Sequence, residues 1–392
     1  MKKALRIIAA AMLILSSALI SGCYDIVELD TISIVTGLGI DKADENGKVQ
    51  LTVQVGKADA VGGGGQEGGE ASEKAYQNLD SVDRNIVGAL DKLLQDNSRT
   101  LFLHHNQVVI FGESHAKEGI SDDIDALMRD LHSHLDVFVL ISETNTSEIF
   151  NVEMELEKIP SVGITRMMRK KTEISEAFGV KMLELISKLS DDPCTAVLPI
   201  IKQVKEQDTT RLSIQGLAVI KDDKMVGKLT EDQAKGYAWA LGKIKSGYLP
   251  VNTDKGTVEL SIKPPSREMK VSFDKEGIPK IKIGIKARFI IGQIIGFDGL
   301  QLEEIIEMIQ KESVNAVKDI IISCFKETQR LNADIFRFGC YLNKHHNKKW
   351  KKIKDKWDQI YPNLELELTV ETQIIDTGKT SKSPKMVGGR LA

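Results

Sequence analysis

The side chain with the clearest chemical role in this chain is the thiol of Cys23, because of the residues that precede it. Three basic residues lie within the first six positions, and an apolar stretch follows over residues 7–20. That order is typical of a secretory signal peptide, and the stretch is shorter than the roughly 20 residues of a membrane-spanning helix. The small residues Ser21 and Gly22 come directly before Cys23. We therefore expect a peptidase to bind an extended, uncrowded backbone at this point.

Residues 1–22 together with Cys23 resemble a bacterial lipoprotein signal. The resemblance implies that the Cys23 thiol receives a diacylglyceryl group and that the chain is cut between Gly22 and Cys23, with or without a further acyl group on the new amino terminus. Several acyl chains anchor a protein stably, whereas one chain binds a membrane only marginally. We expect this covalent lipid and no other cofactor, with the lipid bilayer contacted through Cys23. An uncleaved membrane helix and a chance cysteine in an ordinary signal are the alternatives.

Histidines are the second group that could do chemistry, because five of the seven lie between positions 104 and 134. Adjacent residues of an extended segment point to opposite faces, and the later pair lacks a cysteine or carboxylate at a familiar ligand spacing. We expect ordinary solvated or hydrogen-bonded histidines and no metal at His104, His105, His115, His132 and His134. The sequence also contains no His-Glu-x-x-His, Gly-x-Ser-x-Gly or phosphate-loop motif, so we expect no catalytic residues and no enzyme.

The amino-acid composition indicates a globular protein but excludes few functions. The chain is 28% charged and 42% hydrophobic with a formal net charge of -3, which is ordinary for a globular protein and gives no sign of nucleic-acid binding. Beyond Cys23, three cysteines stand at positions without metal-type spacing: Cys194, Cys324 and Cys340. A disulfide framework is not indicated, and whether Cys324 and Cys340 pair stays open.

A basic segment near the C-terminus is the strongest candidate surface. Its apolar residues recur at helical spacing, which predicts an amphipathic helix: Trp350, Ile353, Trp357 and Ile360. One interpretation is a helix docked by its aromatic face with a solvated basic face. The other is attraction to anionic headgroups, where each Lys contributes about 1 kcal/mol, or to an acidic partner. The candidate contact residues are Lys348, Lys349, Lys351 and Lys352.

The elements that position these residues alternate strands and helices. Residues 32–41 and 49–55 predict a hairpin around Asn46-Gly47, and residues 57–72 a flexible glycine-rich excursion. A strand–helix–strand unit follows, with strands over 107–111 and 136–141 and a helix capped by Ser121. Further helices are expected over 147–156 and 178–189, and one on the stripe Val82, Ile86, Leu90, Leu93 and Leu94.

The second half of the chain predicts two smaller units. Residues 214–220 and 225–229 form a hairpin, and Thr230 with Gln233 forms a capping box that starts a helix. Strands over 280–291 and 364–374 alternate strictly, in the manner of antiparallel sheets, and a helix over 302–330 lies between them. Lysines on one strand and glutamates on the other predict that the two are sheet neighbours. The helix should then cover their shared apolar face.

With these segments placed, the mature chain resembles the Ger(x)C family of spore germination lipoproteins. Six landmarks of that family occur in order: residues 22–25, 37–41, 109–113 with 116–119 and Arg129-Asp130, 216–219 with 226–229, 333–339, and Trp350 and Trp357 before Tyr361-Pro362. The sequence departs from the usual pattern at Tyr24, where the family commonly has Trp. Asp334 in the fifth landmark follows a long helix. We expect it to cap backbone N–H groups or pack locally rather than contact a partner directly.

The resemblance implies a non-enzymatic C subunit of a nutrient germinant receptor, working with A and B membrane subunits at the outer face of the spore's inner membrane. We expect an α+β fold of three domains, each a mixed or antiparallel sheet packed with helices. Their bounds would be 23–205, 206–265 and 266–378, between the signal 1–22 and a flexible tail 379–392. A free-standing solute-binding lipoprotein that delivers a ligand to a transporter is the alternative, but such proteins normally have two parallel-sheet lobes around a cleft.

Overall fold

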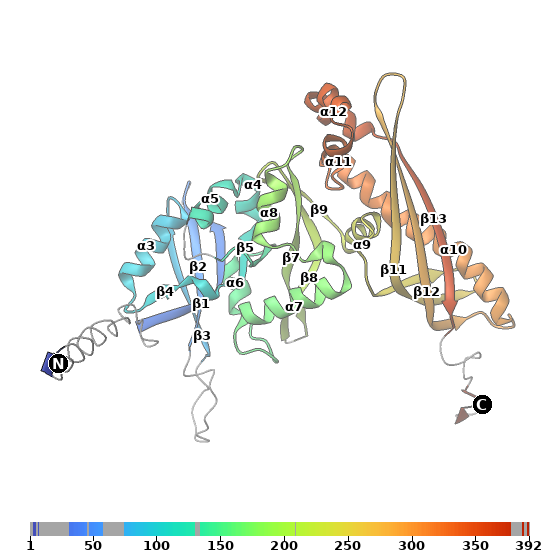
Figure 1. Ribbon diagram of the computed structural model, residues 1–392. Coiled ribbons are helices and arrows are strands. Elements are labelled where there is room, and N and C mark those ends of the chain that lie inside the picture. The colour runs from blue at the N-terminus through green and yellow to red at the C-terminus, as the bar shows by residue number, and fades with distance from the viewer. Residues whose placement is uncertain are drawn as a thin grey trace.

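The computed structural model describes residues 3–4, 7, 31–44, 47–57, 74–129, 134–207, 209–377, 386–387 and 390–391. Nearly all of the predicted signal, including Gly22 and Cys23, lies outside these residues, as do His132 and most of the glycine-rich excursion. Two large sheets and their helices form an elongated α+β molecule (Figure 1), and the predicted fold class is confirmed. Within the described part of the chain, no helix is long and apolar enough to cross a membrane.

The first sheet has nine strands, in the order β3-β2-β1-β5-β6-β7-β8-β9 with the short β4 beside β1. Its centre is parallel and both of its sides are antiparallel. The strands are β1 (Ile32–Lys42), β2 (Val49–Gly56), β3 (Tyr76–Asp83), β4 (Thr100–Phe102), β5 (Val108–Gly112), β6 (Phe138–Ser142), β7 (Thr195–Glu206), β8 (Thr209–Lys221) and β9 (Lys224–Leu229).

Helices cover both faces of this sheet, which is why the central strands β5 and β6 are buried along their whole length. Alternate residues of β5 enter two different apolar clusters, Val109 and Phe111 on one face and Val108 and Ile110 on the other. The first face packs on α3 (Ile86–Asp96), α4 (Glu113–Glu118), α5 (Ser121–Arg129) and α8 (Met182–Leu189). The second packs on α6 (Thr146–Asn151) and α7 (Pro160–Ile174).

The second sheet has four strands in the order β10-β11-β12-β13. Its apolar side shares one large core with α9 (Glu231–Ala240) and the long helix α10 (Leu302–Arg330). That core also takes in Val197, Leu217 and Leu229 of the first sheet, so the two halves are packed together. The strands are β10 (Tyr248–Asn252), β11 (Gly256–Phe273), β12 (Pro279–Gly296) and β13 (Leu366–Asp376).

The predicted pairing of the two alternating strands is confirmed. Lys282 lies opposite Glu367 in the register of β12 and β13, and Lys286 lies opposite Glu371. Helix α10 packs in the core formed by the apolar side of the same strands, as expected. The antiparallel interpretation was wrong for this pair, because the two strands run parallel. A parallel neighbour needs a crossover connection, and α10 with the short helices after it supplies that connection.

The hairpin expected in a small middle unit, over 214–220 and 225–229, belongs to the first sheet. Strands β8 and β9 extend the first sheet, because β7 and β8 form a hairpin around Gln207 (φ 51°) across the expected boundary at 206. Strands β10 and β11 pair with each other and open the second sheet. The predicted tail contains a short antiparallel pair, β14 (Met386–Val387) and β15 (Arg390–Leu391).

Two of the predicted local signals are confirmed, whereas Ser121, predicted as a cap, is the first residue of α5 and its Oγ donates to Asp223 Oδ2 at 2.8 Å. The hairpin of β1 and β2 forms, and the backbone N–H of Gln233 donates to Thr230 Oγ1 at 3.3 Å in the predicted capping box. Val82 was wrongly placed on a helix, because it lies in β3 and the helix begins only after Asn85, whose Oδ1 accepts from Gly88 N at 2.9 Å. The helices expected over 147–156 and 178–189 are shorter, as α6 and α8.

Candidate interaction surface

The candidate surface is held in place by the segment that follows α10, which includes Asp334. The Asp334 side chain is 2% exposed, and its Oδ1 accepts a hydrogen bond from Phe338 N at 3.0 Å while Oδ2 accepts one from Gly339 N at 2.7 Å. These donors are the first backbone amides of α11 (Phe338–His345), which have no partner within their own helix. The expectation that Asp334 caps backbone N–H groups is met by this geometry.

The same carboxylate reaches the basic segment. Trp357 Nε1 donates to Asp334 Oδ2 at 3.2 Å, and the rings of Trp350 and Trp357 meet edge to face with centroids 5.1 Å apart. Burial raises the pKa of Asp334 to about 7, although its three hydrogen-bond donors favour the charged form. Asp334 therefore joins α11 to the helices that carry the lysines: α12 (Asn347–Ile353), the 3-10 turn Lys354–Lys356 and α13 (Trp357–Ile360).

This segment is also fixed to the first half of the molecule. Thr195 Oγ1 at the start of β7 donates to the backbone oxygen of Asp334 at 2.8 Å, and Arg337 forms an ion pair with Asp191. Gly339 leaves no room for a side chain, since a Cβ atom there would lie 2.4 Å from Pro193 Cδ. Sequence reasoning missed these contacts, because their partners are more than 130 residues apart and no local pattern marks them.

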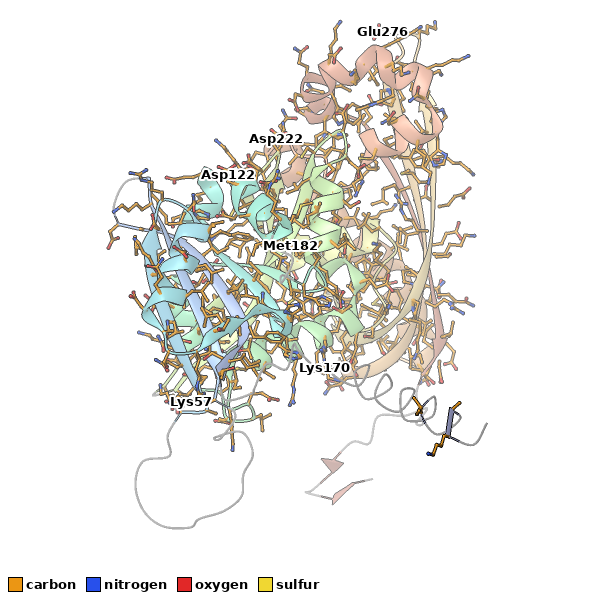
Figure 2. The ribbon with its side chains drawn as sticks, turned by 60° about the vertical axis from the view of Figure 1, so that its left-hand side comes forward. Lys57, Asp122, Lys170, Met182, Asp222 and Glu276 are labelled. Carbon is orange, nitrogen blue, oxygen red and sulfur yellow. The ribbon has the colours of Figure 1, made fainter. Side chains whose placement is uncertain are left out.

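The lysines project from this support into solvent. The apolar side chains of this segment are buried, since only 1% of Trp350, 8% of Ile353 and 4% of Trp357 is exposed. The four candidate lysines are all exposed. Lys349 Nζ lies 3.7 Å above the ring of Phe273 near the tip of the β11–β12 hairpin. That tip, marked by Glu276 in Figure 2, stands at the same end of the molecule as α12 in Figure 1. We call the exposed lysines of residues 344–356 the basic surface.

The basic surface has almost no counter-charge of its own. Lys354 has an acidic neighbour, Asp355, at 3.9 Å. Within the described residues, no carboxylate oxygen lies within 4.0 Å of its other lysines: Lys344, Lys348, Lys349, Lys351, Lys352 and Lys356. Positive charge that the fold leaves unpaired is available to a negatively charged partner. Asp334, which the sequence also offered as a contact candidate, lies beneath this surface.

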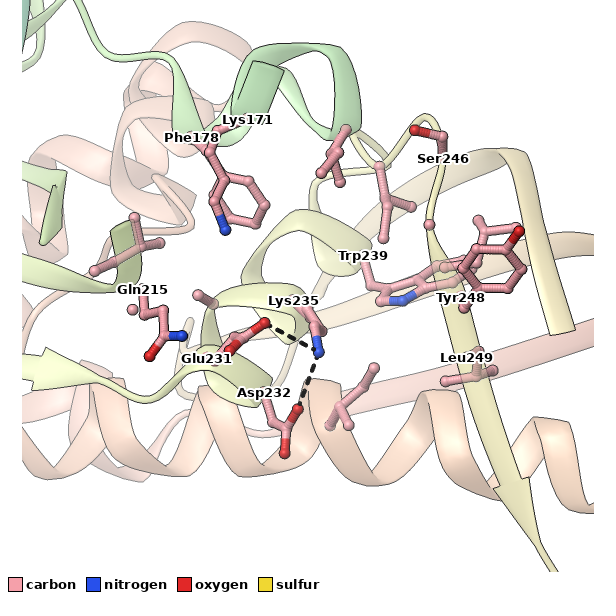
Figure 3. A pocket seen from close by; sticks show the side chains of 18 of the residues that line it. Lys171, Phe178, Gln215, Glu231, Asp232, Lys235, Trp239, Ser246, Tyr248 and Leu249 are labelled. Carbon is pink, nitrogen blue, oxygen red and sulfur yellow. Dashed lines mark hydrogen bonds and ion pairs between the residues drawn. The ribbon is translucent and has the colours of Figure 1, made fainter. Parts of the chain in front are cut away.

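A pocket of about 460 Å³ lies at the junction of the two sheets, beside α9 (Figure 3). Its wall is mainly apolar and includes Trp239 and Phe178, while Lys235 at its edge pairs with Glu231 at 3.5 Å and Asp232 at 3.4 Å. Its lining contains no histidine or cysteine, the usual general base and strongest nucleophile. The pocket can therefore bind a molecule, and the charged groups that the structure pairs at its edge are Lys235, Glu231 and Asp232.

Among the described histidines, His104, His105 and His134 line one pocket of about 530 Å³, and His115 is not part of its lining. His104 and His105 lie on a 3-10 turn (Leu103–His105) rather than on the extended segment that we expected. His115 is buried and its Nε2 lies 2.6 Å from Asp123 Oδ2, a contact between α4 and α5 that the spacing did not reveal. No group of three or more potential metal ligands occurs among the described residues. The three described cysteines are unpaired, with Cys324 buried and Cys340 Sγ 3.9 Å from Pro193 O.

Comparison with known proteins matches both halves of the chain. A family model described as the spore germination protein N-terminal domain matches residues 25–203, and one described as spore germination B3/GerAC like, C-terminal, matches residues 215–378. Spore germination protein KC of Bacillus subtilis (strain 168) is 25% identical over 388 residues, covering 94% of this chain and 95% of its own. Spore germination protein B3 of the same organism is 22% identical over 375 residues, covering 92% and 95%.

A solved structure shows the same fold. The crystal structure of the GerBC protein superposes with a TM-score of 0.57 and covers 90% of this chain and 100% of that one, at 17% sequence identity. Since identity is low, this likeness concerns the fold alone.

Proposed function

Because the chain belongs to the GerAC-like spore germination family, we propose that it is a non-enzymatic, lipid-anchored subunit of a nutrient germinant receptor, needed for the assembly or signalling of the response that starts germination. The observation that carries this proposal is the match of both family models, in order, over residues 25–203 and 215–378. Relatives named as spore germination proteins match along nearly their whole length, so the likeness concerns the complete architecture.

The anchor would be the lipid on Cys23, and it would hold the body at the outer face of the spore's inner membrane. Support for this comes from the sequence alone, through the basic start, the short apolar stretch and the small residues before Cys23. The partners would be the A and B membrane subunits of the receptor.

The basic surface would contact an acidic surface of one of those subunits. An interfacial helix enters a bilayer with its apolar face, but the apolar face of α12 is already used, since Trp350 and Trp357 are buried in the protein's own core. The exposed side of α12 therefore offers a partner only the positive charges of its lysines. The unpaired lysines suit a protein surface with carboxylates, where complementary charges steer association and select the partner.

The experiment that tests the proposal removes the anchor. Cys23→Ala should leave the signal uncut, or the protein mislocalised, and the spores should lose the germinant response. Mass spectrometry of the wild-type N-terminus should show a lipidated Cys23. Cys23→Ala spores that germinate as wild type, or an unmodified Cys23 at the mature N-terminus, would contradict it. A matched control is Cys194→Ala, a half-buried cysteine of the folded body, which should leave localisation unchanged.

The second candidate is the free-standing solute-binding lipoprotein, and the pocket beside α9 is the observation in its favour. The architecture of this chain argues against the second candidate. Strands β10, β11 and β12 of the second sheet pair antiparallel, whereas a solute-binding lobe is built on a parallel sheet. A soluble ligand that stabilises the purified chain without any receptor subunit would support this second candidate.

A further inference from the structure

A large apolar groove opens on the face of the first sheet that α3 and α5 cover. Its volume is about 1010 Å³, at the upper end of the range for ligand sites of roughly 300–1,000 Å³. The floor consists of Leu38, Ile40 and Leu51 of β1 and β2, and the walls include Leu90 of α3 and Leu127 of α5. A groove of this size that reaches the sheet itself is unusual in a close-packed interior, which has few voids larger than a water molecule.

Exposed apolar side chains surround its mouth. Val87 and Leu94 of α3 line the groove and are 60% and 40% exposed, and Met128, next to the lining residue Leu127, is 49% exposed. Contiguous apolar surface on a soluble domain marks an interaction site. The polar residues at the mouth include Arg129, which pairs with Asp125 at 2.7 Å. An apolar interior with a charged rim fits an amphiphile with a hydrocarbon chain and a polar head.

The position of the groove along the chain indicates which amphiphile. Ile32, the first residue of β1, lines the groove, and Cys23 stands nine residues earlier in the sequence. Even a fully extended segment of that length spans only about 30 Å. Figure 1 shows α3, β4 and the start of β1 at one end of the molecule and α12 at the other. Figure 2 agrees, with Lys57 beside the start of β1 far from Glu276.

We propose that this groove takes up an acyl chain of a phospholipid from the leaflet in which Cys23 is anchored. The α3 end of the molecule then rests on the membrane, and the basic surface at the other end points away from it. The position of the groove rests on the lipid anchor of the proposed function, whereas its chemistry rests on the lining residues alone.

The test places a photoreactive side chain at the groove and at a matched site elsewhere. The chain with residues 1–23 replaced by a histidine tag is held on phosphatidylglycerol vesicles through a nickel-chelating lipid, so that the experiment does not depend on Cys23. Val87→p-benzoylphenylalanine is compared with Leu183→p-benzoylphenylalanine, since Leu183 lies on α8 and is similarly exposed, at 62%. We expect a phospholipid adduct after irradiation at position 87 and none at position 183.

A second substitution inside the groove sharpens the result. Leu94→Glu introduces a charge at the mouth, at a position of α3 that is 40% exposed, and should abolish the adduct at position 87. Equal adducts at positions 87 and 183, an adduct that persists in Leu94→Glu, or crosslinks only to the chain's own residues 24–30 would each overturn the proposal. An adduct at 87 combined with an unmodified Cys23 in spores would contradict the anchor and support the groove.

Discussion

Two surfaces of the second half of the molecule carry rows of lysines, and the two rows differ in whether the lysines form ion pairs within the chain. On β12, Lys280 pairs at 3.1 Å with Glu365, which directly precedes β13. Lys282 and Lys286 pair with Glu367 and Glu371 of β13, the latter at 3.1 Å. On the basic surface, the lysines of α12 have no carboxylate within 4.0 Å among the described residues. Paired charges stabilise the register of two strands, whereas a cluster of unpaired charges of one sign can attract a partner of opposite charge. The comparison separates lysines that form ion pairs across neighbouring strands from lysines that we propose contact a partner.

The largest effect should come from removing the support beneath the unpaired row. Asp334→Ala would leave Phe338 N, Gly339 N and Trp357 Nε1 without their acceptor in a buried site, and each such loss costs about 1–3 kcal/mol. We expect the free energy of unfolding of the mature chain to fall by about 3 kcal/mol or more, measured by urea denaturation. Asp334→Asn, which keeps one acceptor oxygen, should lose less. Equal stability of Asp334→Ala and wild type would show that the hydrogen bonds of Asp334 do not stabilise the helices that carry the lysines.

The same carboxyl group predicts a pH dependence. Burial raises the pKa of Asp334 to about 7 from 3.8, so between those values the folded state holds a proton that the unfolded state has released. The contribution of this group to the free energy of unfolding is therefore fully present below about pH 4 and is lost as the pH rises through about 7. Unfolding measured at pH 5.5 and 7.5 should show wild type gaining stability at the lower pH relative to Asp334→Asn. A constant difference between the two proteins would contradict this.

A smaller effect is expected in the paired row. Lys282→Glu places two like charges opposite each other on β12 and β13, and cross-strand charge pairs contribute roughly 0.2–1 kcal/mol. Stability should fall by about 1 kcal/mol or less, more at low than at high salt. The swapped double variant Lys282→Glu/Glu367→Lys should recover most of that loss. A double variant as unstable as the single one would mean that the pair does not act through its charges.

The smallest effect on stability is expected in the unpaired row. Lys348→Glu/Lys352→Glu removes no ion pair from the fold, so the free energy of unfolding should stay within about 0.5 kcal/mol of wild type. Thermal denaturation at low salt provides the measurement. A marked destabilisation would show that these lysines pair within the chain after all and would remove the difference between the two rows.

Each of these two rows of lysines could be predicted from the sequence only in part. Strict alternation and opposite charges are local properties, so they predicted that residues 280–288 and 365–371 lie side by side, yet pairing alone does not give direction, and the strands proved parallel. The helical spacing of Trp350, Ile353 and Trp357 predicted which side of the basic segment is buried. What holds that segment could not be predicted, because Thr195 and Asp191 contact it from the other half of the chain.

The central claim is that the basic surface binds an acidic surface of a receptor subunit, and co-purification from spore membranes tests it most directly. Lys348→Glu/Lys352→Glu is compared with Lys311→Glu/Lys326→Glu, which makes the same charge change at two exposed lysines of α10 that have no ion pair within 4.0 Å among the described residues. We predict that the first variant recovers about tenfold less of the A and B subunits than wild type, a loss of about 1.4 kcal/mol in binding free energy, because it places like charges opposite the partner's carboxylates. The second variant should recover both subunits normally. Full recovery of both subunits by Lys348→Glu/Lys352→Glu would contradict the account.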